Sequence, residues 1–138
     1  MATQNNVLDY AKAIQAQLTT TVNPVPVYAS FNRNFASQQK FVTWNLRNVH
    51  QPVYTGTTQS VKGIDRPIFQ TNIYAGTLQD AFGIANTIIQ ALHGYSGQFG
   101  GVTGFYISKL DIDWLYNTYE NDINLHSIYL DCTMDIPT

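Results

Sequence analysis

The stretch that decides the fold is RPIFQTNIYAGTLQDAFGIANTIIQALHG, Arg66–Gly94, in which a two-residue periodicity gives way to a helical one. In its first part Phe69, Thr71 and Ile73 alternate with polar residues, which predicts a half-buried strand. The second part predicts an amphipathic helix. Its apolar face consists of Leu78, Ala81, Phe82, Ala85, Ile88, Ile89 and Leu92. Such a helix needs a sheet to pack on, so we expect the other strands to assemble beneath it.

The ends of this helix have suitable capping residues. Thr77 stands three positions before Asp80, so the hydroxyl and the carboxylate can each accept a free backbone N–H at the helix start. Gly94 can adopt the left-handed conformation that closes a helix. These residues therefore predict where the helix begins and ends.

Upstream, a first helix is predicted over Asn6–Thr20 with Asn6 as its N-cap, followed by an edge strand in Pro24–Ser30, where prolines stand at the start. The alternation in Phe41–Arg47 predicts a second strand. The narrow apolar stripe of the helix is Leu8, Ala11, Ile14 and Leu18, and the inward face of the second strand is Val42, Trp44 and Leu46.

Between His50 and Asp65, the segment QPVYTGTTQSVKGI has two glycines and little apolar periodicity, which predicts a long exposed loop or a hairpin arm. Loops of about twelve residues or more are uncommon in compact domains and are often functional. The composition suits pairing with a neighbouring chain, and a surface loop without a partner explains it equally well. The candidate interface residues of this arm are Tyr54, Thr57, Gln59, Val61 and Ile64.

The glycine-rich run Gly94–Gly104 follows a helix and opens a strand, without the Lys that ends a phosphate-binding loop. We interpret it as a flexible connection. Phe105–Tyr116 and Leu125–Met134 then predict an antiparallel strand pair, because only a short turn joins them. Phe105 and Ile107 have the opposite parity to the apolar residues that follow, which indicates a bulge or an end buried on both faces. The predicted inward residues are Leu110, Ile112 and Trp114, then His126, Ile128, Leu130, Cys132 and Met134.

Together these elements predict an α+β fold with a mainly antiparallel sheet of about five strands, two helices packed on one face, and a long loop or hairpin arm. With 138 residues, the chain is expected to form one domain, residues 1–138. Hydrophobic residues make up 44% and charged residues only 12% of the chain, about half the usual charged share. Interface cores are depleted in charge, so this composition favours subunit contacts, and a monomer with an uncharged polar surface is the alternative.

The net charge of −2 conceals an uneven distribution. Residues 1–110 have seven Lys or Arg against three Asp, a balance of +4, whereas residues 111–138 have six Asp or Glu and no Lys or Arg, a balance of −6. An acidic strand pair would repel phosphates, which disfavours nucleic-acid binding there. A solvated acidic strand face is the more ordinary interpretation of such a run.

One cysteine excludes an internal disulfide framework, and Cys132 is expected to be a small buried hydrophobe because it alternates with apolar neighbours. MATQNNVLDY lacks the basic start and apolar run of a secretory signal. No stretch approaches the length that spans a bilayer. We therefore expect synthesis and assembly in a cytoplasm.

Residues capable of catalysis do not converge in this sequence. His50, His93 and His126 are not spaced as zinc ligands, and His126 has the parity of a core residue. Asp111 and Asp113, with Asp131 or Glu120, could hold a divalent cation, although carboxylates two apart on a strand are commonplace. We expect no active site, no cofactor and no metal.

The order of elements resembles the bacteriophage tail terminator or tail completion proteins, the family also called DUF3168, which is related in fold to the minor tail protein U group. Three segments carry the resemblance: PVPVYASF near the start, RPIFQTNIYAGTLQDAFGIANTIIQALHG in the middle and INLHSIYLDCTMDI at the end. In that family an alternating strand ends in a small polar turn before a helix that closes as "ALHG" does here. The resemblance covers most of the chain and rests on patterns rather than on catalytic signatures.

The resemblance implies a structural virion protein, not an enzyme, that caps the tail tube and joins it to the head connector. Its implied partners are further copies of itself in a ring, usually a hexamer, the tail tube protein, and a head connector or head-completion protein. DNA would pass through the lumen without specific binding, and no membrane is involved. The implied location is the virion tail or neck, after assembly in the host cytoplasm. Asp111, Asp113 and Asp131 are the candidate lumen-facing acidic residues.

Other classes of function remain open from the sequence. Another neck, connector or tail-associated subunit would share the same features. A carbohydrate-binding virion module would expose Trp44 or Trp114 beside tyrosines. A small enzyme would depend on His126.

Overall fold

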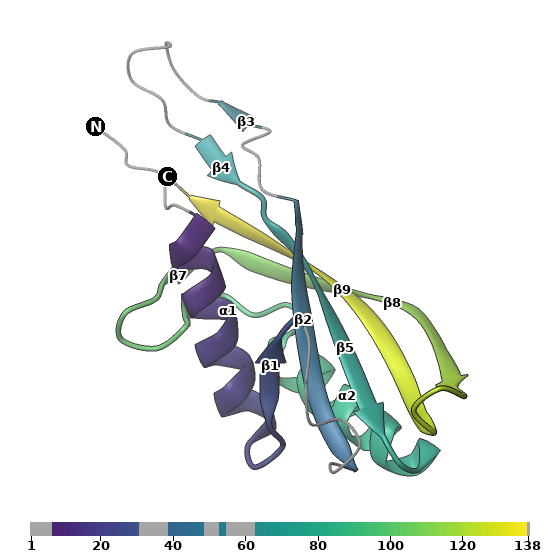
Figure 1. The fold of residues 1–138 in the computed structure, drawn as a ribbon. Helices are drawn as coiled ribbons and strands as arrows, with labels where there is room; N and C mark the ends of the chain where they lie inside the picture. Colours follow the sequence, from purple (N-terminus) through teal and green to yellow (C-terminus); the bar gives the residue numbers. More distant parts are fainter. Residues whose placement is uncertain (1–6, 31–38, 49–52, 55–62, 138) are drawn as a thin grey trace.

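The computed structural model describes residues 7–30, 39–48, 53–54 and 63–137 (Figure 1). Its helices are α1 (Val7–Val22) and α2 (Leu78–Leu92). Its strands are β1 (Val27–Ala29), β2 (Lys40–Asn48), β3 (Val53–Tyr54), β4 (Gly63–Asp65), β5 (Ile68–Ala75), β6 (Gly97–Phe99), β7 (Phe105–Ile107), β8 (Lys109–Glu120) and β9 (Leu125–Pro137).

The main sheet has the order β1-β2-β5-β9, with β8 on the outer side of β9 and the short β4 and β3 continuing it at one end. Among the described strands, β1 and β2 pair in parallel and the other neighbours are antiparallel. The hairpin β6–β7 is separate. This arrangement confirms the predicted α+β fold and its mainly antiparallel sheet.

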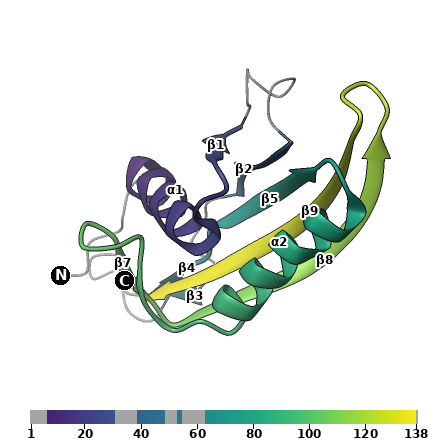
Figure 2. The same cartoon turned by 90° about the horizontal axis from the view of Figure 1, so that it is seen from below.

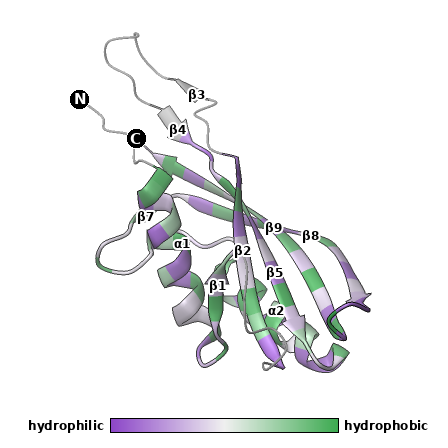
Figure 3. Cartoon of the chain, in the orientation of Figure 1, coloured by the Kyte–Doolittle hydropathy of each residue, from purple (hydrophilic) through white to green (hydrophobic). Residues whose placement is uncertain are grey.

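Both helices lie against one face of the sheet, and α1 and α2 contact each other there (Figure 2). The alternation in β5 and β9 appears as hydrophobic and hydrophilic bands along the strands (Figure 3). On β5, Phe69, Thr71 and Ile73 are fully buried, as predicted. On β9, Ile128, Leu130, Cys132 and Met134 are fully buried as well. His126 is only half-buried and makes an edge contact with Tyr119, with ring centroids 4.9 Å apart.

Helix α2 begins and ends where its capping residues predicted. The Thr77 hydroxyl accepts a hydrogen bond from the backbone N–H of Asp80 at 3.2 Å, and Gly94 has a φ of 78°. The predicted apolar face was wrong in its first turn, because Leu78 and Phe82 are 40% and 42% exposed. The first turn of the helix reaches the edge strand β8, where the sheet ends, so part of that face lies beyond the sheet.

The buried face of α1 also differs from the predicted stripe. Leu8 is 60% exposed, whereas Tyr10 is fully buried. The phenol ring of Tyr10 packs edge-on against Phe105, with centroids 5.7 Å apart, and its hydroxyl donates to Asp65. A tyrosine whose ring packs and whose hydroxyl is hydrogen-bonded can occupy a core position, although a search for apolar residues at helical spacing leaves it out. Asn6, the predicted N-cap, lies outside the described residues.

The glycine-rich run is a β-hairpin, β6–β7, rather than a flexible connection. Phe99 and Ile107 of this hairpin are fully buried. The change of parity after Ile107 has a simple cause: β7 pairs with β6, and the chain then crosses to pair β8 with β9. The bulge in β8 lies further along, between Trp114 and Tyr116. Neither helix in the described part of the chain is long and apolar enough to cross a membrane.

Candidate interaction surfaces

The sheet face opposite the helices, here called the open face, collects the charged side chains of β8 and β9. Strand register places Asp113 directly beside Asp131 and Asp111 beside Thr133. The three predicted lumen-facing carboxylates, Asp111, Asp113 and Asp131, therefore lie together on one face. In the described residues, Oδ1 of Asp131 is buried without a hydrogen-bond partner.

Three basic residues, two of them from distant parts of the chain, offset this acidic strand pair. Arg47 of β2 forms an ion pair with Asp131, and this pairing raises the pKa of the Arg47 guanidinium. Nε of Arg66 lies 2.7 Å from Oδ1 of Asp135. Nζ of Lys109 lies 3.1 Å from Oδ2 of Asp111. The expected acidic face is thus a face of mixed charge.

In the described part of the chain, the ionisable groups do not converge as a metal site would require. Across the described ranges, no three His, Cys, Asp or Glu side chains form a group that could hold a metal ion. Glu120 instead accepts hydrogen bonds from the hydroxyls of Ser127, at 3.0 Å, and Tyr129, at 2.7 Å. Nδ1 of His93 accepts from the backbone N–H of Ile112 at 3.0 Å, and His50 lies outside the described residues. Burial raises the pKa of the Cys132 thiol to about 12, so this thiol is a structural group.

Aromatic rings cross the open face near the β8–β9 turn. Phe41 contacts Tyr28 edge-on at 6.5 Å and stacks on Tyr74 at 4.8 Å between centroids. Tyr116 lies 4.7 Å from Tyr129. Burial raises the pKa of both Tyr74 and Tyr129. These contacts were missed from the sequence because they join rings on different strands, and only the strand parity of each ring could have indicated them.

A second surface, here called the β8 rim, gathers exposed apolar side chains at the edge of the sheet. It consists of Leu78 and Phe82 of α2 with Trp114, Leu115 and Tyr119 of β8, all between 40% and 44% exposed. Phe82 stacks on Trp114 with centroids 5.7 Å apart and an interplanar angle of 19°. Trp114 has the inward parity that was predicted, yet it lies on the flank of α2 and remains 42% exposed.

The outer edge of β8 is hydrogen-bonded to the end of α2 and the residue after it over only part of its length. The backbone N–H of Gly94 donates to the carbonyl of Leu110 at 2.7 Å, and Ile112 donates to His93. In the part of the chain that the structure describes, no strand pairs with this edge beyond Trp114. An edge strand with large apolar side chains is a common site of protein association.

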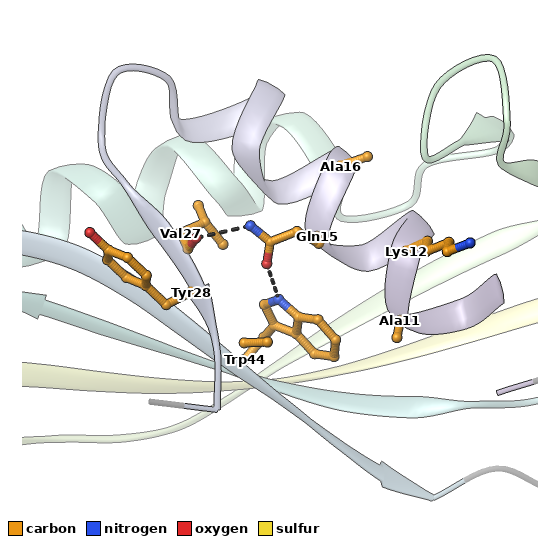
Figure 4. Close-up of a pocket in the computed structure, with 8 residues that line it drawn as sticks. Ala11, Lys12, Gln15, Ala16, Val27, Tyr28 and Trp44 are labelled. Carbon is orange, nitrogen blue, oxygen red and sulfur yellow. Dashed lines mark hydrogen bonds between the residues drawn. The ribbon is translucent and has the colours of Figure 1, made fainter. Parts of the chain in front are cut away.

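The opposite edge of the sheet carries a cleft between α1 and β1, here called the α1–β1 cleft (Figure 4). Its volume is about 590 Å³, and its lining is Ala11, Lys12, Gln15, Ala16, Val27, Tyr28, Ala29 and Trp44. Gln15 accepts from the Trp44 indole N–H at 2.7 Å and donates to the carbonyl of Val27 at 2.9 Å. Trp44 is only 6% exposed, so it does not offer the ring face that a carbohydrate-binding module would need.

The part of the predicted arm that the structure describes is a hairpin formed by β3 and β4. β3 pairs with β4 through Tyr54 and Gly63, and Ile64 of β4 pairs with Pro137 of β9. Thr57, Gln59 and Val61 lie outside the described residues. At the base of the hairpin, Asp65 is 4% exposed and accepts the hydrogen bond from Tyr10. Burial and this carboxylate raise the pKa of Tyr10.

The chain matches no protein-family model and no curated protein sequence. Solved structures do share its fold. A chain of the virion of a native gene transfer agent particle has a TM-score of 0.59 at 15% identity, over 95% of both chains. The sheath/tube terminator of an extracellular contractile injection system, in the extended state, has a TM-score of 0.56 at 12% identity; the match covers 99% of this chain and 58% of that one. At such identities the likeness establishes that the chain has the fold of these particle components.

Proposed function

We propose that the chain is a structural component of a phage-type tail, with the role of a tail terminator. The observation that carries this proposal is the shared fold with a virion chain over 95% of its length and with a contractile-system terminator over 99% of this chain. The distinguishing features of the described residues are surfaces: the open face, the β8 rim and the α1–β1 cleft. A non-enzymatic role in assembly accounts best for such a molecule.

In its finer form, the proposal is that copies of this single domain form a closed ring of six, in the manner of the tail terminator family, on the end of the tail tube. The ring would join the tube to the head connector in the neck of the particle, after assembly in the host cytoplasm. Two features support an oligomer: charged residues are only 12% of the chain, and the β8 rim exposes large apolar groups.

We further propose that the open face lines the channel of this ring. Three cations (Arg47, Arg66, Lys109) stand there against five carboxylates (Asp111, Asp113, Glu120, Asp131, Asp135), which leaves a balance of −2. A weakly negative wall repels DNA phosphates without a strong field. DNA would then slide through without being held.

The test is the mass of the protein in solution, measured by sedimentation and native mass spectrometry across a concentration series, alone and with purified tail tubes. We expect a closed oligomer whose mass is a multiple of 15.5 kDa, seen as rings by electron microscopy. A protein that stays monomeric under all these conditions would contradict the ring. Rings with Asp111 and Asp131 on their outer surface would contradict only the channel assignment.

A carbohydrate-binding virion module is the second candidate, because Trp114 is 42% exposed and stacks on Phe82. Stacking of a sugar on this ring would quench tryptophan fluorescence. Titration with a panel of oligosaccharides separates the two candidates. Saturable quenching that is lost in Trp114→Ala would favour carbohydrate binding, and the terminator role predicts none.

A further inference from the structure

We infer that the β8 rim of one subunit packs into the α1–β1 cleft of the next, so that the subunits associate head to tail. This inference rests on the proposed ring. It identifies the two contacting surfaces, which lie at opposite edges of the same sheet: β1 is one edge strand and β8 the other. A contact between two different surfaces repeats around a rotation axis, and it closes into a ring when the rotation allows.

The β8 rim has the apolar and aromatic composition of a surface that becomes buried between two proteins. Five of the ten large hydrophobic residues that are exposed in the described part of the chain belong to it, so exposed apolar side chains are concentrated there. Aromatic residues are enriched at the centres of interfaces, where they supply much of the binding energy. The stacked pair Phe82–Trp114 is already ordered within one subunit, so little side-chain entropy remains to be lost on association.

The cleft is mainly apolar and has room for side chains of this size. Ala11, Ala16 and Ala29 leave room for large side chains, and the volume of about 590 Å³ accommodates several of them. The amide of Gln15 is already satisfied, because it bonds both the Trp44 indole and the Val27 carbonyl, and the charged lining residue Lys12 is exposed. An apolar side chain can therefore enter without leaving the Gln15 amide unpaired.

Gln15 also indicates how the partner subunit binds: it inserts side chains into the cleft and does not add a strand to the edge of β1. The amide of Gln15 occupies the carbonyl of Val27, on the edge of β1 that faces away from β2 (Figure 4). Addition of a strand to β1 would require that carbonyl to accept a backbone N–H from the partner. The cleft thus accepts protruding side chains such as those of the rim.

Charge complementarity favours a second copy of the chain as the occupant. Lys12 lines the cleft, and among the described residues it belongs to no ion pair. Asp122 lies in the β8–β9 turn, three residues beyond Tyr119 of the rim, and it also belongs to no ion pair among those residues. Contact between the two edges can bring these opposite charges together, whereas contact of two rims would bring together two acidic turns, which is unfavourable.

Three arginine variants test the inference. Leu115→Arg places a bulky cation on the rim, Ala16→Arg blocks the cleft, and Val102→Arg is the matched control on the β6–β7 turn, where Val102 is 100% exposed. All three positions are exposed or partly exposed in the single subunit, so each variant is expected to fold. Tyr119→Arg and Ala29→Arg replace the first two variants if circular dichroism shows misfolding.

We expect wild type and Val102→Arg to form the same closed oligomer, and Leu115→Arg and Ala16→Arg each to lose assembly. An equimolar mixture of these two variants should form a heterodimer and nothing larger, since one rim and one cleft remain intact between them. If Ala16→Arg still assembles, or the mixture stays monomeric, the inference is overturned while the ring stands. A monomeric wild type would instead overturn the ring itself, and the head-to-tail contact with it.

Discussion

Tyr10 connects two distant parts of the fold through one buried hydrogen bond. Its hydroxyl donates to Asp65, which lies 55 positions away at the base of the β3–β4 hairpin. Both residues are buried, at 0% and 4% exposure. A carboxylate in this position depends on its donor, because an unpaired buried charge is costly. The pair therefore anchors the hairpin to α1.

Tyr10→Phe is expected to lower the free energy of unfolding by about 1–3 kcal/mol, the cost of leaving the Asp65 carboxylate without its donor. Urea denaturation followed by circular dichroism measures the change. Tyr106→Phe is the control, because Tyr106 is 56% exposed and should tolerate loss of its hydroxyl. An equal effect at both positions would show that the Tyr10 hydroxyl has no special role. In a double-mutant cycle with Asp65→Asn, the two costs should not add.

Residue by residue, the direction of side chains was predictable and their partners were not. Parity alone placed Ile128, Leu130 and Cys132 in the core, because a strand alternates with a fixed period. The ion pair of Arg47 with Asp131 joins positions 84 apart. No local pattern encodes such a pairing, which follows from strand order. Consequently the acidic strand pair was predicted without the basic residues that partly neutralise it.

At the scale of elements, the β6–β7 hairpin depends on a close approach to α1. A Cβ on Gly100 would lie 2.6 Å from both Cα and Cβ of Ala13, and the residue has a φ of 88°. Glycine is therefore required here for space and for conformation. The contact holds the hairpin against the helix whose other face lines the α1–β1 cleft.

Gly100→Ala is expected to destabilise the fold by about 1–3 kcal/mol through overpacking and left-handed strain. Gly83→Ala is the matched control within α2, where an added Cβ has nothing within 4 Å. That substitution should stabilise the protein by about 0.5–1 kcal/mol, since alanine favours a helix interior. Thermal unfolding of both variants measures the two effects. A neutral Gly100→Ala would mean that the hairpin can move away from α1 at little cost.

Long periodic elements were predicted well and short ones poorly. α2 and β5 contain enough repeats for their type to be evident, and Thr77 and Gly94 mark the ends of the helix by local chemistry. β6 and β7 have three residues each, too few for a period, and the glycines around them resemble those of a loop. The exposed first turn of α2 was missed because a sequence does not show where a sheet ends.

For the whole molecule, the arrangement of surfaces matters more than any one of them. The rim and the cleft lie at opposite edges, the charged open face lies between those edges, and the β3–β4 hairpin lies at the end away from the β8–β9 turn (Figure 1). A subunit of such a ring needs two lateral contacts, a face that lines the channel, and a segment that extends along the ring axis or to a neighbour. We propose that the hairpin and the residues it connects form that extending segment.

This role of the arm is tested by shortening it. Residues 55–62 are replaced by Asn-Gly, a turn that suits the antiparallel pairing of Tyr54 with Gly63. The strands of the described sheet lie outside residues 55–62, so we expect the free energy of unfolding to change by less than about 0.5 kcal/mol. Assembly, measured by sedimentation, should weaken at least about tenfold, which corresponds to about 1.4 kcal/mol of lost contact.

A second variant separates the length of the arm from its side chains. It keeps residues 55–62 but replaces Thr57, Gln59 and Val61 with glycine or serine. If side chains make the contact, this variant should assemble as poorly as the shortened one; if the backbone pairs with a neighbour, it should assemble more strongly. Wild-type assembly by the shortened protein would remove the arm from the interface, and the ring would then rest on the rim and the cleft alone, because those surfaces are formed by α1, β1, β2, α2 and β8.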